Sequence, residues 1–102
     1  MHVVSKGPFD EAARKFPNDA KALLDTYRAF KQGSFTNPGD MKAIFPSLDR
    51  MKYKDKWWVI DLGGNNLRVM FYADFENGKL FIKEISTHAE YDKLIKKYRE
   101  NT

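Results

Sequence analysis

The sequence predicts an α+β domain in which two N-terminal helices cover one face of a mostly antiparallel sheet of three to four strands, and a short C-terminal helix closes the chain. Three observations predict this fold. Two apolar stripes with helical spacing come first, alternating apolar and polar residues follow, and a helix-capping motif precedes a last apolar stripe. The chain has 102 residues and no linker-like segment, so we expect one domain, residues 1–102.

Proline, asparagine and glycine delimit the first two helices. Pro8 suits the first position of a helix, and Pro17 ends that helix because a proline cannot continue its hydrogen bonding. The apolar stripe between them consists of Phe9, Ala12, Ala13 and Phe16. Asn18 is expected to cap the second helix and Gly33 to end it. Its stripe consists of Ala20, Leu23, Leu24, Tyr27 and Phe30.

The strands are expected mainly in the second half. They are predicted at residues 2–5, as a short edge strand, and at residues 56–62, 67–76 and 79–86. Residues 33–55 are expected to be irregular. Gly63–Asn66 joins the first two of the longer strands, and Asn77–Gly78, the strongest short hairpin signal, joins the last two. Thr87–Glu90 has the pattern of a capping box that begins the final helix.

The turn lengths predict a register. A two-residue Asn77–Gly78 turn would pair Glu76 with Lys79, Tyr72 with Lys83, and Arg68 with Thr87. A Gly64–Asn65 turn would pair Asp61 with Arg68 and Trp57 with Tyr72. Arg68 would then lie beside Thr87, and therefore close to His88 in the first turn of the last helix.

The same register sorts the strand residues onto two faces. The core face, which the helices cover, would carry Trp58, Ile60, Leu62, Leu67, Val69, Phe71, Ala73, Phe75, Leu80 and Ile82. The other face would carry Trp57, Val59, Asp61, Arg68, Met70, Tyr72, Phe81, Lys83 and Ile85. Because a solvated face normally holds fewer aromatic residues, this mixed face is expected to bind a partner.

Composition narrows the function classes. The net charge of +4 is compatible with a nucleic acid, an anionic membrane surface or an acidic protein as partner. The absence of cysteine excludes disulfides and a thiol nucleophile, and the two histidines, His2 and His88, form no cluster with ligand spacing, so we expect no metal and no cofactor. No apolar run is long enough to span a membrane, and residues 1–6 lack the core of a signal peptide. We therefore expect a cytoplasmic protein.

His88, Tyr91 and Arg68 form the first candidate site. His88 and Tyr91 are three residues apart on the last helix and share one of its faces. A histidine at a helix N-terminus is expected to be neutral and able to accept a proton, and the same helix end attracts phosphate. Arg68 could grip phosphate oxygens. RNA carries its own nucleophile, the 2′-hydroxyl, so cleavage needs little more than these groups.

That spacing also has a structural interpretation. His88 could simply follow the cap, Tyr91 could be the first core residue of its helix, and Arg68 could be the ion-pair partner of Asp61. On spacing alone, the structural interpretation is the commoner one for such residues.

A second candidate is the run from Arg50 to Trp58, in which cations alternate with aromatic residues. Such a run is typical of a surface that neutralises phosphates and stacks unpaired bases. A solvated loop that enters a strand explains it equally well. The glycine pair within Gly63–Asn66 lacks the further pattern of a phosphate-binding loop, and a tight hairpin explains it better.

Three ordered motifs in the chain resemble the HigB-type toxins of the RelE superfamily. They are Gly63-Gly64-Asn65-x-Leu67-Arg68, Thr87-His88-x-Glu90-Tyr91-Asp92, and Lys42-Ala43-x-Phe45-Pro46-Ser47-Leu48-Asp49 followed by Lys52-Tyr53. The resemblance covers residues 42–92, and the paired helices before them fit as well.

The resemblance implies a RelE-like fold and metal-independent cleavage of messenger RNA, in many members on the ribosome. It also implies a HigA-type antitoxin with a helix-turn-helix domain, which neutralises the toxin, often in a complex of two toxins and two antitoxins that represses its own operon. By motif, Arg68, His88 and Tyr91 are the catalytic candidates. The RNA-binding candidates are Lys42, Arg50, Lys52, Lys54, Lys56, Trp57 and Lys83, the last at a position where many relatives carry arginine.

Two other functions fit the same residues. One is a non-catalytic module that binds RNA or an acidic protein, which would tolerate the loss of His88. The other is a domain that binds a helical peptide across the mixed sheet face. A neighbouring reading frame that encodes a helix-turn-helix protein would argue against the second.

Overall fold

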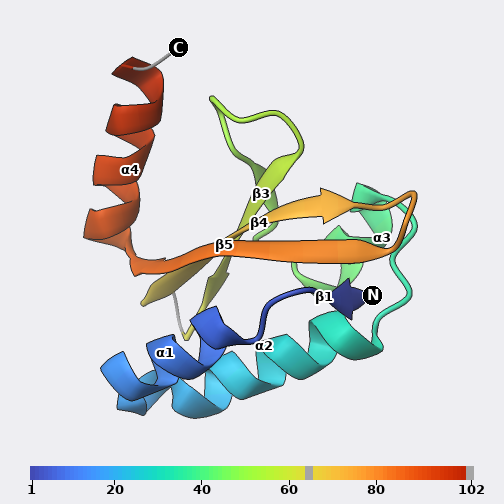
Figure 1. The fold of residues 1–102 in the computed structure, drawn as a ribbon, viewed down its shortest axis with the longest axis horizontal. Helices are drawn as coiled ribbons and strands as arrows, with labels where there is room; N and C mark the ends of the chain where they lie inside the picture. Colours follow the sequence, from blue (N-terminus) through green and yellow to red (C-terminus); the bar gives the residue numbers. More distant parts are fainter. Residues whose placement is uncertain (64–65, 101–102) are drawn as a thin grey trace.

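The structure, a computed structural model, describes residues 1–63 and 66–100 and has the predicted α+β architecture. Two helices lie below a five-stranded sheet and the last helix rises from the opposite face (Figure 1). The elements are β1 (His2–Val3), α1 (Gly7–Lys15), a 3₁₀ turn (Pro17–Asp19), α2 (Ala20–Gln32), α3 (Pro38–Ile44), β2 (Asp49–Arg50), β3 (Trp57–Leu62), β4 (Leu67–Asp74), β5 (Lys79–Thr87) and α4 (His88–Glu100).

The predicted paired helices are confirmed, with one error at their junction. Pro8 lies in the first turn of α1, and α2 ends before Gly33. Asn18 does not cap α2. It lies within the 3₁₀ turn, and the residue that precedes α2, Asp19, makes no side-chain capping bond. Pro17 begins that turn, which moves the start of α2 by one residue relative to the prediction.

The segment predicted to be irregular, residues 33–55, contains two elements. Asn37 caps α3 by accepting a hydrogen bond from the Asp40 backbone N–H over 2.9 Å. Further on, the short strand β2 pairs antiparallel with β3. Both elements are too short to show a periodicity in the sequence, and the Asn37–Pro38 pair reads as a turn as readily as a helix start.

The sheet has five strands in the order β1-β5-β4-β3-β2, not three to four. The predicted edge strand near the N-terminus is confirmed as β1, which pairs parallel with the start of β5. The three long strands are antiparallel to one another. The last helix, α4, has 13 residues, as many as α2, so the prediction of a short C-terminal helix is wrong.

The register between β3 and β4 is confirmed, and the register between β4 and β5 is wrong. Asp61 pairs with Arg68 and Trp57 with Tyr72, while the proposed Gly64–Asn65 turn lies outside the described residues. In the second hairpin Asp74 pairs with Lys79, so the connection has four residues, not two.

A side chain and a bulge account for this difference. The Asp74 carboxylate accepts hydrogen bonds from the backbone and side-chain nitrogens of Asn77, at 3.1 and 2.8 Å, and so stabilises the longer turn. The register then shifts between Met70 and Phe71, which leaves Lys83 as an extra residue in β5. The predicted partners of Glu76, Tyr72 and Arg68 are therefore all incorrect.

The main core lies between the sheet and α1 and α2. Phe30 and Phe71 are fully buried at its centre, with their ring centroids 5.2 Å apart. Ile85, predicted on the mixed face, packs against this core because the bulge reverses the direction of the strand residues that follow it.

The other face of the sheet is partly covered by the protein itself. Val59 and Met70 are buried there in a second cluster with Met51 and Tyr91, against which the apolar side of α4 packs. The mixed face is therefore not one open surface, since residues of α4 cover Val59 and Met70. Among the described residues, no helix is both long and apolar enough to cross a membrane.

Candidate active site

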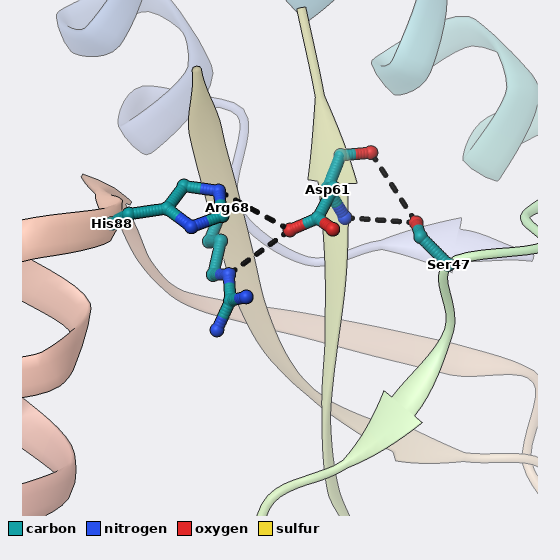
Figure 2. Close-up of polar contacts among 4 residues, drawn as sticks. All are labelled: Ser47, Asp61, Arg68 and His88. Carbon is teal, nitrogen blue, oxygen red and sulfur yellow. Dashed lines mark hydrogen bonds and ion pairs between the residues drawn. The ribbon is translucent and has the colours of Figure 1, made fainter. Parts of the chain in front are cut away.

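Asp61 and Arg68 form the centre of the candidate site. They are cross-strand partners on β3 and β4, and Arg68 Nε donates to Asp61 Oδ1 over 3.0 Å. Both side chains are about one quarter exposed, at 24% for Asp61 and 27% for Arg68. The predicted Asp61–Arg68 ion pair therefore exists. The pair engages only Nε, and in Figure 2 the two terminal guanidinium nitrogens point away from Asp61.

His88 reaches the same carboxylate from α4. Its Nε2 lies 3.6 Å from Asp61 Oδ1, and in Figure 2 it approaches that oxygen from the same side as Arg68 Nε does. The prediction that Arg68 and His88 lie close together is confirmed, although the residue that pairs with Arg68 is Ser86 and not Thr87. The predicted proximity of Arg68 and His88 survives the register error because a shift of one residue moves a strand by only about 3.3 Å.

The predicted capping box fixes the position of His88. Glu90 N donates to Thr87 Oγ1 over 3.2 Å, and Thr87 N donates to Glu90 Oε1 over 3.0 Å. These bonds lower the pKa of the Glu90 carboxyl, to which Lys15 on α1 adds an ion pair at 3.5 Å. His88 is consequently held at the first position of α4, where β5 ends.

Ser47 anchors the main chain of Asp61. Its hydroxyl accepts a hydrogen bond from Asp61 N over 2.9 Å and donates to Asp61 O over 3.5 Å (Figure 2). Ser47 follows α3 and precedes β2. The loop after α3 therefore holds β3 at the residue that contacts both Arg68 and His88.

Tyr91 lies under Arg68. The Arg68 guanidinium carbon is 4.5 Å from the centroid of the Tyr91 ring. Tyr91 is only 8% exposed and belongs to the cluster beneath α4. The structural interpretation of Tyr91 as a core residue is therefore correct. Burial raises the pKa of its hydroxyl, although the nearby Arg68 charge opposes that shift in part. The phenol thus stays protonated at neutral pH and is suited to donate a hydrogen bond.

An open hollow of about 430 Å³ adjoins Tyr91 between β2 and α4. It is lined by Asp49, Arg50, Lys52, Tyr91, Asp92 and Ile95. Two of the predicted RNA-binding residues, Arg50 and Lys52, are therefore next to the site. Arg50 also makes an exposed ion pair with Asp55 at 3.5 Å.

Three other predicted RNA-binding residues gather near Tyr98, two turns farther along the same face of α4 as Tyr91. Lys54 lies 4.7 Å from the ring centroid of Tyr98, and Lys83 lies 5.5 Å from that of Trp57. We call this group the cation–aromatic cluster, and it consists of Lys54, Trp57, Tyr72, Phe81, Lys83 and Tyr98. Lys83 is placed here by the bulge in β5 and is not the cross-strand partner of Tyr72.

The remaining two predicted RNA-binding residues belong to neither group, although Lys56 lines a second hollow together with Arg50 and Tyr72. Lys42 is exposed on α3, and no contact within the described part of the chain joins it to the site. Lys56 has a positive φ of 62° and lines a different hollow, which includes Asp74 and Phe75. The run from Arg50 to Trp58 is therefore divided among three places because its loop turns sharply before β3.

Sequence reasoning missed two residues of the site and undervalued a third. Ser47 and Asp49 stand in the Lys42–Asp49 motif, but that motif gave neither residue a role before the loop was placed in space. Asp61 was considered only as the partner that would make Arg68 structural, yet it contacts both Arg68 and His88. The signal was available, because the predicted pairing already placed it opposite Arg68.

The groups at the site can perform acid–base chemistry on an anionic substrate. The imidazole of His88 and the guanidinium of Arg68 meet at Asp61, and Arg68 also contacts the protonated phenol of Tyr91, which lines the open hollow. Within residues 1–63 and 66–100, no three histidine, aspartate or glutamate residues are placed to hold a metal ion.

Comparison with known proteins agrees with the resemblance seen in the motifs. A family model described as HigB toxin, the RelE-like toxic component of a toxin–antitoxin system, matches residues 19–94. The mRNA interferase HigB of Escherichia coli O6:H1 (strain CFT073) is 55% identical over 101 residues, which cover 99% of this chain and 98% of the relative. The mRNA interferase toxin HigB of Escherichia coli K12 is 41% identical over 92 residues, or 90% of this chain and 88% of the relative. Since the model spans most of the chain and these relatives align over nearly all of it, the chain belongs to the HigB family of RelE-like toxic components of toxin–antitoxin systems.

Proposed function

We propose that this chain is an mRNA interferase, an endoribonuclease that cuts messenger RNA without a metal ion. The observation that carries the proposal is the convergence of His88 and Arg68 on one carboxylate oxygen of Asp61, beside an open hollow. The family and the names of its relatives support the same reaction.

The reaction follows from the groups present. His88 takes the proton of the ribose 2′-hydroxyl, whose oxygen attacks the adjacent phosphorus. The terminal nitrogens of Arg68, which do not bond Asp61, bind the phosphate oxygens and stabilise the charge that develops on them. The Tyr91 hydroxyl donates a hydrogen bond to the phosphate, and the departing 5′-oxygen takes a proton from water as the P–O5′ bond breaks. The products are a 2′,3′-cyclic phosphate and a free 5′-hydroxyl.

We propose that the RNA contacts two surfaces at different turns of α4, one beside Tyr91 and one beside Tyr98. Val59 and Met70 lie between the pairs Asp61–Arg68 and Trp57–Tyr72, and α4 packs on them. The hollow with Arg50 and Lys52 would hold the nucleotides at the cleaved bond. The cation–aromatic cluster lies about 13 Å farther along β4 and would contact RNA away from that bond.

The partners that follow from the family complete the proposal. We propose that the toxin works in the cytoplasm on translating ribosomes and is neutralised by a HigA-type antitoxin with a helix-turn-helix domain. A complex of two toxins and two antitoxins would bind operator DNA through the antitoxin and repress the operon.

Cleavage by the purified chain tests the activity and its dependence on the ribosome together. A defined mRNA is incubated with the wild type or with His88→Ala. Each protein is tested in EDTA without ribosomes and, separately, in magnesium buffer with stalled ribosomes. The 5′ ends of the mRNA are then mapped. The proposal predicts new 5′-hydroxyl ends with the wild type alone. Cleavage by neither protein, in either setting, would favour a module that only binds RNA.

Copurification tests the antitoxin. The chain is coexpressed with the product of the neighbouring reading frame, and the complex is weighed by light scattering. A stable complex of two copies of each chain, which cleaves no mRNA and shifts its own promoter DNA, is expected. Failure of the two proteins to associate would remove the HigA part of the proposal.

A further inference from the structure

We propose that Asp61 is a positioning residue that holds the His88 imidazole with its proton on Nε2, so that Nδ1 is the nitrogen that acts on the substrate. The inference rests on the proposed ribonuclease function for its catalytic meaning. The geometry that supports it is independent of that function.

The first argument is the burial of Nε2. This atom has almost no exposed surface and no hydrogen-bond partner within 3.5 Å among the described residues. The acceptor that faces it is Asp61 Oδ1, at 3.6 Å. A buried polar nitrogen without a partner is costly, and bonds at catalytic groups commonly tighten when substrate binds. A small rotation of the ring would complete a bond from Nε2–H to Oδ1.

The second argument is electrostatic. If Nε2 carried no proton, its lone pair would face the negative oxygen of Asp61, and the two would repel each other. With the proton on Nε2, the contact becomes attractive and Nδ1 carries the free lone pair. In Figure 2, Nδ1 lies on the side of the ring away from the Asp61 carboxylate, as do the terminal nitrogens of Arg68.

The third argument is that one oxygen positions two groups. Asp61 Oδ1 also accepts the hydrogen bond from Arg68 Nε. Nε is thereby engaged, and the terminal nitrogens of the guanidinium remain for phosphate. A single carboxylate therefore sets the distance between the group that takes the proton and the group that binds the phosphate. Preorganisation of this kind lowers the cost of reaching the transition state.

The anchoring of Asp61 agrees with this role. Ser47 bonds both main-chain polar groups of Asp61, and Arg68 lies opposite it in the sheet. Neither Ser47 contact uses the carboxylate. Replacing the side chain at position 61 therefore leaves the main-chain anchor in place, which makes the residue suitable for substitution.

The spectroscopic test uses the ring N–H of His88. The chain has two histidines, and His2→Gln identifies the signals of His88. In the ¹⁵N-labelled wild type we expect a protonated Nε2, an unprotonated Nδ1, and a downfield Nε2–H proton that exchanges slowly with water. In Asp61→Asn, the neutral amide oxygen should shift this proton upfield. In Asp61→Ala, the proton should exchange too fast to be seen.

The kinetic test separates positioning from binding. Single-turnover cleavage should fall about tenfold in Asp61→Asn, which keeps an acceptor oxygen, and by about 10² or more in Asp61→Ala. RNA affinity should hold or rise slightly in both, since a negative charge is removed. Asp25→Asn, an equal change of charge at an exposed residue of α2, is the matched control and should cleave as the wild type does.

Two results would contradict the positioning role of Asp61. A wild-type imidazole protonated on Nδ1, or an Asp61→Asn protein whose resonance and rate both equal the wild type, would overturn the proposal. If Asp61→Ala fails to fold, the Asn variant still carries both measurements. If the wild type cleaves no RNA, the proposed function fails, whereas the Nε2–H resonance still tests the positioning by Asp61.

Discussion

The guanidinium of Arg68 lies against the ring of Tyr91, with its central carbon 4.5 Å from the ring centroid. Tyr91 thus has two roles that can be separated by mutation. Its ring fills the cluster beneath α4 and supports Arg68, while its hydroxyl, whose pKa burial raises, remains a donor.

Tyr91→Phe should separate these roles. The ring remains, so the free energy of unfolding should change by about 1 kcal/mol or less, whereas cleavage should fall about 10²-fold because the donor is lost. Tyr91→Ala should also lower the free energy of unfolding, by about 3–5 kcal/mol, because the ring itself is removed. Urea denaturation and single-turnover cleavage measure the two effects. Full activity of Tyr91→Phe would confine Tyr91 to packing.

Arg68→Lys should abolish most activity although the charge is kept. A lysine cannot bond Asp61 through Nε and also present two donors to a phosphate. We expect cleavage to fall by about 10² or more, with a smaller loss of RNA affinity. Arg14→Lys makes the same replacement at an exposed position of α1 and should cleave normally. Equal rates in the two variants would show that the charge of Arg68 suffices.

Glu90→Gln should change how stability depends on pH. The folded protein lowers the pKa of Glu90, so its stabilising contribution is present above the ordinary value of 4.5 and is lost as pH falls through the lowered one. Glutamine still completes the capping box. At pH 7 the variant should be less stable by about 0.3–1 kcal/mol, and near pH 2.5 it should match the wild type. Urea denaturation at both pH values checks this, and a difference that grows in acid would contradict it.

Lys83 and Lys42 should differ in their effect on RNA binding. Lys83 belongs to the cation–aromatic cluster, whereas Lys42 lies apart on α3. Lys83→Ala should weaken RNA binding and reduce the slope of log affinity against log salt by about one. Lys42→Ala should leave both quantities unchanged. Fluorescence anisotropy across a salt series measures them. The opposite ranking would show that α3, and not the cluster, contacts RNA.

Local signals predicted much of the fold. The helices α1 and α2, the Thr87–Glu90 capping box and the Asp61–Arg68 pairing depend on neighbours in sequence or across a tight turn. These predictions are confirmed, except that Leu24, predicted in the apolar stripe of α2, is exposed. The β4–β5 register was missed because the side chain of Asp74 stabilises a longer turn, and a bulge then takes up one more residue. Neither effect is visible in the Asn77–Gly78 pattern.

The candidate site was predicted in outline only. Arg68 and His88 were placed together, but the atom that joins them, Asp61 Oδ1, depends on where α4 begins relative to β3, which are far apart in sequence. The separation of the predicted RNA-binding residues into groups at different turns of α4 depends likewise on tertiary packing. Patterns of alternation place residues on a face of the sheet, but they do not show that Val59 and Met70 on that face lie beneath a helix.

The most direct test of the central claim is to induce the chain in a bacterium and map mRNA 5′ ends, with wild type beside His88→Ala, Arg68→Ala and the control Arg14→Ala. The account predicts growth arrest and new cleavage sites with the wild type and the control, and neither in the two site variants at equal soluble expression. Arrest with the same cleavage sites in His88→Ala would contradict the role of His88. Normal growth and intact mRNA from soluble wild type would contradict the nuclease itself.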